Sequence, residues 1–227
     1  MKAFFFDLDG TLTDSRTGLH DSFRAAIEAI GVMPLGDAEL DLFLGTPLPE
    51  MFRTLKADIS QAGIEAGIDA FRAYYETHGI RQNRAYPGVR EMLEALKTRR
   101  IPVWVVTSKP QAYAERVIRD LGFADLVTDV VGAGLAELDT KSDLVKRALG
   151  EAGVAPGDAV MVGDRRYDVE GAKANGVVAV GVTWGYGTRE ELESAGCDRL
   201  VESVSEFCQI FIDRSIVLRT RTAAAAC

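Results

Sequence analysis

An apolar segment near the start of the chain ends in two acidic residues, and this junction constrains the fold more than any other feature. Phe4-Phe5-Phe6 has the composition of a buried strand, and Asp7-Leu8-Asp9-Gly10 follows it directly. If strand geometry continues through the junction, Asp7 and Asp9 point to the same side and share one small volume. Two such carboxylates repel each other unless a metal or a proton separates their charges. Taken alone, the junction also fits an ordinary acidic turn.

Three apolar segments, far apart in the chain, end in polar residues that are able to carry out chemistry. Besides the first strand, the predicted strand Ile101–Val106 leads into Thr107-Ser108, and Ala159–Val162 leads into Gly163-Asp164. Helical patterns separate the strands, which is typical of a doubly wound, Rossmann-like α/β fold with a mainly parallel sheet. Right-handed crossovers bring the carboxyl ends of such strands to one edge of the sheet, where ligands bind. We therefore predict one shared site at that edge. Further strands are predicted at Leu126–Val131 and Val177–Val182.

The segment between the first strand and residue 83 shows helical patterns only. Apolar residues recur at helical spacing from Leu19 to Ile30, and Ser60 is placed to cap a helix that runs towards Thr77. This stretch is far longer than an ordinary connection in a compact domain. We predict an inserted all-helical cap at residues 15–83, a catalytic core at 1–14 and 84–215, and a C-terminal tail at 216–227.

The composition excludes several classes of function. The chain has 26 Lys+Arg against 34 Asp+Glu and a net charge of −8, whereas nucleic acids and anionic membranes require a basic face. Cys197, Cys208 and Cys227 are odd in number and lack CxxC spacing, so we expect neither a disulfide framework nor a zinc site. Residues 1–6 lack the pattern of a signal peptide and no apolar run reaches membrane-spanning length, so we expect neither a signal peptide nor a membrane-spanning segment. We expect a cytoplasmic protein whose partner is a small molecule, and the sequence does not indicate an oligomeric state.

Four motifs, taken together and in order, resemble those of the haloacid dehalogenase superfamily of phosphohydrolases. Asp7-Leu8-Asp9-Gly10-Thr11 resembles the first motif, Thr107 the second, Lys141 the third, and Gly163-Asp164 with Asp168 the fourth. The predicted helical insertion lies where this family carries a small helical cap. The resemblance implies a phosphatase that depends on Mg²⁺ and acts through an aspartyl-phosphate.

The residue types suit the roles that the resemblance assigns. Asp7 is the expected nucleophile, because a carboxylate with a reference pKa of about 3.9 is ionised at pH 7 and needs no activating base. Asp9 is expected to donate and accept the proton. The only histidines, His20 and His78, lie in the predicted cap, which argues against a Ser-His arrangement. The expected phosphate-binding residues are Gly10, Thr107, Ser108 and Lys141.

By the same resemblance, Mg²⁺ is bound by the side chains of Asp7 and Asp164 and by the backbone carbonyl of Asp9. Asp168 lies close by or acts through water. Oxygen ligands and a substrate phosphate are what Mg²⁺ prefers. Two unit charges at 4 Å interact by about 4 kcal/mol at an effective dielectric constant of 20, so a phosphate beside these carboxylates requires cations. Mg²⁺ and Lys141 would supply them.

The choice of substrate is expected to depend on the cap. The segments Phe43–Leu48 and Trp184–Gly187 resemble the phosphoglycolate phosphatase and 5′-nucleotidase branch, so we expect phosphoglycolate or a nucleoside 5′-monophosphate as substrate. Arg165 stands where a serine is frequent in the family, and the sequence leaves its role open. Gly-x-Pro in the cap also fits a simple turn before a helix. The candidate specificity residues are Gly45, Pro47 and Arg53.

Two alternative functions stay open at this point. A sugar phosphomutase would share the motifs but would transfer the phosphoryl group to a second sugar hydroxyl. A non-catalytic module would keep the fold and only bind a phosphorylated metabolite, although the complete set of motifs argues against it.

Overall fold

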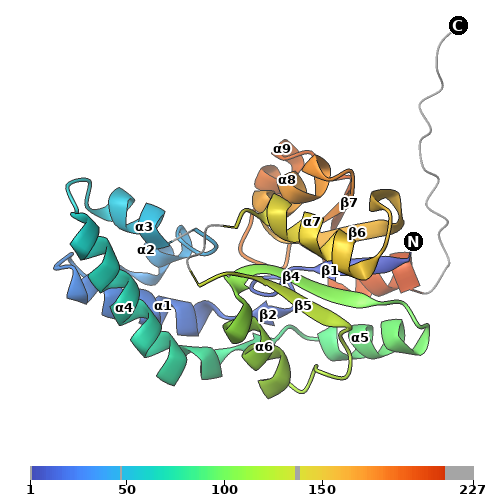
Figure 1. The fold of residues 1–227 in the computed structure, drawn as a ribbon, viewed down its shortest axis with the longest axis horizontal. Helices are drawn as coiled ribbons and strands as arrows, with labels where there is room; N and C mark the ends of the chain where they lie inside the picture. Colours follow the sequence, from blue (N-terminus) through green and yellow to red (C-terminus); the bar gives the residue numbers. More distant parts are fainter. Residues whose placement is uncertain (1, 47, 136–138, 213–227) are drawn as a thin grey trace, which may run out of the picture.

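A parallel sheet flanked by helices forms the centre of the computed structural model, which describes residues 2–46, 48–135 and 139–212 (Figure 1). In this part of the chain, six strands form one sheet in the order β5-β4-β1-β6-β7-β8, and every neighbouring pair is parallel. The predicted Rossmann-like α/β fold is therefore confirmed. In sheet order, the strands are β5 (Asp129–Ala133), β4 (Val103–Pro110), β1 (Ala3–Phe6), β6 (Ala159–Gly163), β7 (Val178–Val182) and β8 (Arg199–Val201).

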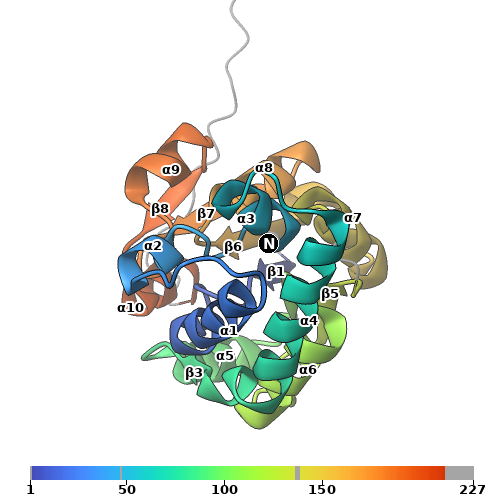
Figure 2. The ribbon, with the colours of Figure 1, turned by 90° about the vertical axis from the view of Figure 1, so that its left-hand side faces the viewer.

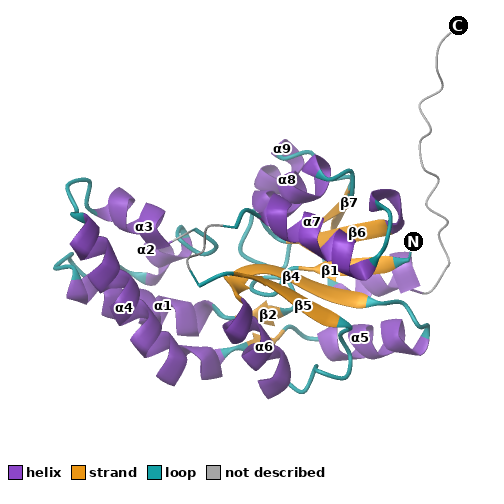
Figure 3. Cartoon of the chain, viewed as in Figure 1, coloured by secondary structure: helices purple, strands orange, loops and turns teal. Residues whose placement is uncertain are grey.

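Helices cover both faces of the sheet because its strands are apolar on both sides (Figure 3). Phe4 and Phe6 point to one face and pack with Phe207, whereas Phe5 points to the other face, as the alternation of a strand requires. The first face is covered by α5 (Val89–Thr98), α6 (Gln111–Asp120) and α10 (Val204–Phe207). The second face is covered by α7 (Lys141–Ala152), α8 (Arg166–Ala174) and α9 (Arg189–Ser194).

Side-chain caps fix the starts of several of these helices. The hydroxyl of Thr188 accepts a hydrogen bond from the backbone N–H of Glu191 at 3.1 Å, and Ser203 accepts one from Glu206 at 3.1 Å. Thr140 caps α7 in the same way, which places Lys141 in the first turn of that helix. Helices α7, α9 and α10 therefore start at defined residues.

A separate group of helices lies beyond the carboxyl ends of the strands (Figure 1), and in Figure 2 it stands in front of the sheet. Ser60 caps the longest of them as predicted, accepting a hydrogen bond from the N–H of Gly63 at 3.1 Å. In the described residues no helix is long and apolar enough to cross a membrane. The group consists of α1 (Arg16–Ala29), α2 (Asp37–Asp41), α3 (Leu48–Leu55) and α4 (Gln61–Thr77).

Two short strands join this helical insertion to the sheet. β2 (Thr13–Asp14) and β3 (Arg84–Ala85) pair antiparallel where the chain leaves the sheet and where it returns. They were not predicted, and neither was β8, because strands of two or three residues have no measurable period. Strand β4 also extends beyond its predicted end to Pro110, with an irregularity in register after Thr107. The predicted tail at residues 216–227 lies outside the described residues.

Candidate active site

The carboxyl ends of three neighbouring strands meet at one cavity, as the order of the sheet requires. Asp7 follows the central strand β1, Thr107 lies in β4, and Asp164 follows β6. The backbone N–H of Asp7 donates to the carbonyl of Val162 at 2.9 Å, so the ladder between β1 and β6 extends to the nucleophile candidate. The cavity, about 410 Å³ in volume, is lined by residues from this edge and from helices of the insertion.

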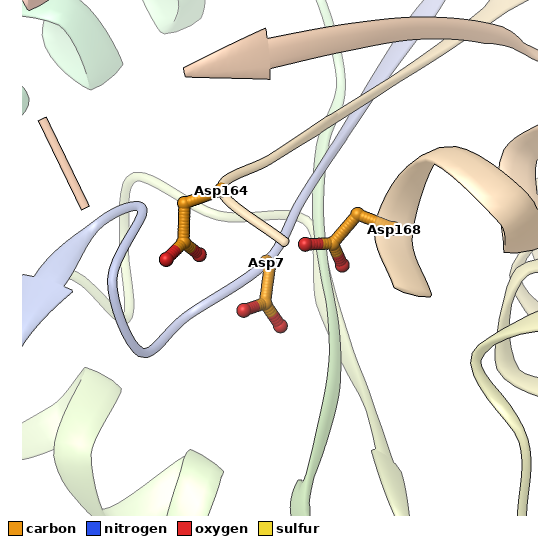
Figure 4. Close-up of side chains that lie close together, drawn as sticks. All are labelled: Asp7, Asp164 and Asp168. Carbon is orange, nitrogen blue, oxygen red and sulfur yellow. The ribbon is translucent and has the colours of Figure 1, made fainter. Parts of the chain in front are cut away.

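Three buried carboxylates converge at this edge. One oxygen from each of Asp7, Asp164 and Asp168 lies within 4.8 Å of the others. The three side chains come from different elements and point towards one another (Figure 4), Asp168 from the first turn of α8. Carboxylate oxygens at this separation are suited to a hard divalent cation such as Mg²⁺. The described residues therefore contain a donor set that fits the expected metal.

The electrostatics of this cluster also call for a cation. Burial raises the pKa of Asp164 to about 8, and the charges of Asp168 and Asp7 add to the shift. Burial likewise raises the pKa of Asp7 to about 6, with Lys141 opposing the shift and Asp168 adding to it. Burial and repulsion thus raise the pKa of both Asp7 and Asp164, and a bound cation would favour their ionised forms.

Lys141 supplies one positive charge from the start of α7. Its Nζ lies 2.6 Å from Asp7 Oδ1 and 2.9 Å from Asp168 Oδ1, and it also donates to the carbonyl of Val106 at 3.1 Å. Burial alone would lower the pKa of Lys141, but the carboxylates of Asp168 and Asp7 raise it above its ordinary value. Lys141 is therefore a fixed cation beside the candidate nucleophile, where it can also reach a phosphate.

Asp9 is held by a second buried lysine, Lys109, which the sequence analysis missed. Lys109 Nζ lies 2.6 Å from Asp9 Oδ2, and the Lys109 side chain is only 5% exposed. Among the described residues, Asp9 Oδ1 is buried and has no hydrogen-bond partner. One carboxylate oxygen is thus fixed while the other is available to a ligand. Lys109 stands two places after Thr107 in strand β4, and both side chains are buried while Ser108 between them is exposed.

The segment after β7 fixes the position of Asp164. Its Oδ1 accepts a hydrogen bond from the hydroxyl of Thr11 at 3.1 Å, and Oδ2 accepts one from the backbone N–H of Tyr186 at 2.8 Å. Trp184 Nε1 donates to the carbonyl of Thr11 at 3.0 Å. A Cβ at position 185 would lie 2.2 Å from the carbonyl oxygen of Gly10, so only glycine allows this approach. The signature Trp184–Gly187 is therefore part of the site.

The phosphate-binding candidates are placed close to these carboxylates. Thr107 is buried and lines the cavity, and its Oγ1 accepts a hydrogen bond from the N–H of Lys109 at 3.2 Å. Ser108 lines the cavity as well. Gly10 has a left-handed φ of 86° and turns the chain directly beside Asp164.

The candidate specificity residues differ in their position relative to the cavity. Gly45 lines the cavity, whereas Arg53 is exposed and is not among the described residues that line it; Pro47 lies outside the described residues. Arg165 Nε lies 2.9 Å from Glu191, and its guanidinium donates to the carbonyl of Leu44. Arg165 therefore connects the sheet edge to the loop of the insertion that contains Gly45, a role the sequence had left open.

Neither His20 nor His78 is among the described residues that line the cavity. His20 is buried and its Nε2 lies 3.0 Å from Asp41 Oδ1 within the helical insertion.

Comparison with known proteins gives consistent matches across most of the chain. Residues 4–182 match the family described as haloacid dehalogenase-like hydrolase. A 5′-nucleotidase of Pseudomonas aeruginosa is 35% identical over 83% of this chain and 86% of its own length. A phosphoglycolate phosphatase of Neisseria meningitidis is 34% identical over 82% of both chains. The tyrosine-protein kinase PtkA of Mycobacterium tuberculosis is 37% identical over 83% of this chain. The match covers only 64% of the length of that relative.

Solved structures show the same architecture. A crystal structure of a predicted phosphatase from Clostridium acetobutylicum superimposes with a TM-score of 0.86 and 33% sequence identity. The match covers 92% of this chain and 96% of that chain, so it includes the helical insertion as well as the sheet.

Proposed function

The chain belongs to the haloacid dehalogenase-like hydrolase family, and on that premise we propose that it is a phosphatase acting on small phosphomonoesters through an aspartyl-phosphate at Asp7. The observation that carries this function is the buried cluster of Asp7, Asp164 and Asp168 with Lys141 beside it. The names of the relatives, a 5′-nucleotidase and a phosphoglycolate phosphatase, support the same class of substrate.

In the first step, a carboxylate oxygen of Asp7 attacks phosphorus and the bond between phosphorus and the ester oxygen breaks. Lys141 and the hydroxyl of Thr107 bind the oxygens of the phosphoryl group. Asp9 donates its proton from Oδ1 to the leaving oxygen, while Lys109 holds Oδ2 in place. The products of this step are the free alcohol and the phosphorylated Asp7.

In the second step, Asp9 accepts a proton from a water molecule, whose oxygen attacks the phosphorus on Asp7. The bond between phosphorus and the Asp7 oxygen breaks, so inorganic phosphate leaves and the carboxylate is restored. Asp9 has then returned to its protonated form. The separate placement of the two carboxylates is what allows one to carry the phosphoryl group and the other to move the proton.

Asp7, Asp164 and Asp168 are the side chains that would hold Mg²⁺, and the backbone carbonyl of Asp9 is the further ligand we propose. When bound, Mg²⁺ would neutralise charge on the phosphoryl oxygens. Thr11 and the N–H of Tyr186 keep the Asp164 carboxylate oriented for this task. Ser108 and the backbone at Gly10 complete the proposed phosphate site.

We also propose that residues 15–83 act as a cap over this site, with 1–14 and 84–215 as the catalytic core. Phosphoglycolate and nucleoside 5′-monophosphates are the two candidate substrates. The cap closes the cavity in which the leaving group must lie, so its residues, with Gly45 among them, would select the ester.

A panel of phosphate esters tests this function. Phosphoglycolate, AMP, UMP, pyrophosphate and hexose phosphates are incubated with the purified protein and MgCl₂, and released phosphate is measured. We expect hydrolysis of at least one monoester, its loss with EDTA, and its loss in Asp7→Asn. Activity retained in purified Asp7→Asn would refute the assignment of the nucleophile. No hydrolysis across the panel would instead favour a non-catalytic binding module.

A further inference from the structure

Four aromatic side chains form a continuous row along one wall of the cavity. Phe23 comes from α1, Phe71 and Tyr75 from α4, and Tyr113 from α6, and all four line the cavity. Ring centroids are 5.4 Å apart for Phe23 and Phe71, 5.8 Å for Phe71 and Tyr75, and 5.5 Å for Tyr75 and Tyr113. We call this row the aromatic wall. It spans the junction between the helical insertion and the sheet.

The aromatic wall passes close to the proton-transfer residue. Lys109 Nζ lies 2.6 Å from Asp9 Oδ2 and 4.7 Å from the centroid of the Tyr75 ring. A leaving group whose ester oxygen meets Asp9 therefore extends towards Tyr75 and Phe71. Leu19 and Leu48 line the same cavity and add to its apolar character.

The charges around the cavity disfavour a second anionic group on the substrate. Every Lys or Arg among the described residues that line the cavity already binds oxygen atoms of the protein, so a carboxylate on the leaving group would have to compete for them. Lys109 binds Asp9, Lys141 binds Asp7 and Asp168, Arg165 binds Glu191 and the carbonyl of Leu44, and Arg72 binds the carbonyl of Leu135.

The size of the cavity also favours a substrate larger than a two-carbon ester. Its volume of about 410 Å³ falls within the range of about 300 to 1,000 Å³ that is usual for ligand pockets. A two-carbon phosphate ester would leave most of this volume empty, whereas a planar ring would fill the space along the aromatic wall. Ring contacts of this kind contribute beyond the burial of apolar surface alone.

We propose that the aromatic wall binds the leaving group of the substrate, and that the substrate is a phosphomonoester whose leaving group carries a planar ring, as in nucleoside 5′-monophosphates and aryl phosphates. This inference rests on the proposed phosphatase function and narrows its substrate class. It assigns Phe71 and Tyr113 as specificity-determining residues.

The first test compares ring-bearing with ring-free esters on the wild-type protein with MgCl₂. UMP, AMP and phenyl phosphate form one group, and phosphoglycolate, glycerol phosphate and methyl phosphate form the other. We expect kcat/KM at least about tenfold higher for the best ring-bearing ester, and the ranking within that group distinguishes a nucleotide from an aryl phosphate. Equal or higher kcat/KM for a ring-free ester would overturn the inference, while the phosphatase function would stand.

The second test removes one ring of the wall. Phe71→Leu keeps an apolar side chain, and we expect it to lower kcat/KM for ring-bearing esters about 2- to 10-fold more than for methyl phosphate. Phe123→Leu is the matched control, because Phe123 is equally apolar and buried but packs against Arg90 outside the cavity. An equal loss for both groups of esters in Phe71→Leu would show that the ring serves folding alone. Tyr113→Leu, at a half-buried position, gives the same comparison if Phe71→Leu does not fold.

A binding measurement separates this inference from the phosphatase function. Asp7→Asn cannot form the aspartyl-phosphate, so calorimetric titration with UMP and with phosphoglycolate, in the presence of MgCl₂, reports binding alone. We expect the Kd for UMP to be at least about tenfold lower. Equal values, or tighter binding of phosphoglycolate, would overturn the inference even if the wild-type protein hydrolysed no ester in the panel.

Discussion

Replacing Asp164 by Asn is expected to stabilise the metal-free protein and to abolish its response to Mg²⁺. Asp164 is fully buried within reach of two other carboxylates, and its ionisation in the folded state is opposed by burial and by the charges of Asp168 and Asp7. Asn has nearly the same shape and carries no charge. The substitution therefore removes repulsion and a metal ligand together.

The size of the effect follows from the pKa shift. The pKa of Asp164 rises from 3.8 to about 8 on folding, so the folded state holds the proton more tightly than the unfolded state. Its contribution to stability is therefore greatest below about pH 4 and is lost as the pH rises towards about 8. Between 3.8 and pH 7 there are about three pH units, each equal to about 1.4 kcal/mol, which limits the loss to about 4 kcal/mol.

Asn cannot reproduce both hydrogen bonds that the carboxylate accepts from Thr11 and from the N–H of Tyr186. One impaired hydrogen bond costs about 1 kcal/mol. The net gain in the free energy of unfolding at about pH 7 without metal is then about 1 to 3 kcal/mol.

Urea unfolding followed by circular dichroism measures this effect at about pH 5 and about pH 7, with EDTA or with MgCl₂. We expect the wild-type protein in EDTA to lose stability as the pH rises, and Mg²⁺ to restore it by about 2.7 kcal/mol when its concentration is about 100 times Kd. Asp164→Asn should lose the response to Mg²⁺ and should lose less stability than the wild-type protein as the pH rises, because burial still raises the pKa of Asp7. Asp58→Asn, at an exposed position, is the matched control. A variant that keeps the full response to Mg²⁺ would refute Asp164 as a metal ligand.

Three further predictions concern residues that position the site. Lys109→Met should lower kcat about 10-fold or more, because Asp9 loses the partner that fixes Oδ2. The loss of kcat should be smaller for esters with good leaving groups, such as 4-nitrophenyl phosphate. An equal loss for all esters would contradict this role. Arg165→Gln should raise KM with little change in the free energy of unfolding, because its contact with the Leu44 carbonyl is lost. Arg166→Gln, at an exposed position, should change neither quantity. An unchanged KM in Arg165→Gln would refute the role of Arg165 in connecting the sheet edge to the loop that contains Gly45. Gly185→Ala should destabilise the protein by more than about 2 kcal/mol in thermal or urea unfolding, because its Cβ would overlap the Gly10 carbonyl; wild-type stability would show that the segment can move aside.

The sequence predicted the sheet edge because the signals there are local. Asp7, Thr107 and Asp164 each end an apolar segment, and parallel connectivity then brings the three ends together without knowledge of any contact. The capping residue Ser60 was equally predictable, since it accepts a hydrogen bond from a backbone N–H only three residues away.

What the sequence did not predict depends on contacts between distant segments. Lys109 binds Asp9 across 100 positions, and no local pattern reports that pairing. The aromatic wall arises only when α1 and α4 pack beside α6, and its members look like core residues in a helical pattern. Arg53 was chosen because it follows the Gly-x-Pro segment closely, and in α3 it lies at an exposed position.

The central claim is that Asp7 carries the phosphoryl group during turnover. Rapid acid quench during hydrolysis of the best ester, followed by proteolysis and mass spectrometry, tests it directly. We expect the mass of one phosphoryl group on the peptide that contains Asp7, and on no peptide from Asp7→Asn. A phosphoryl group on a different residue, or full turnover by purified Asp7→Asn, would contradict the account.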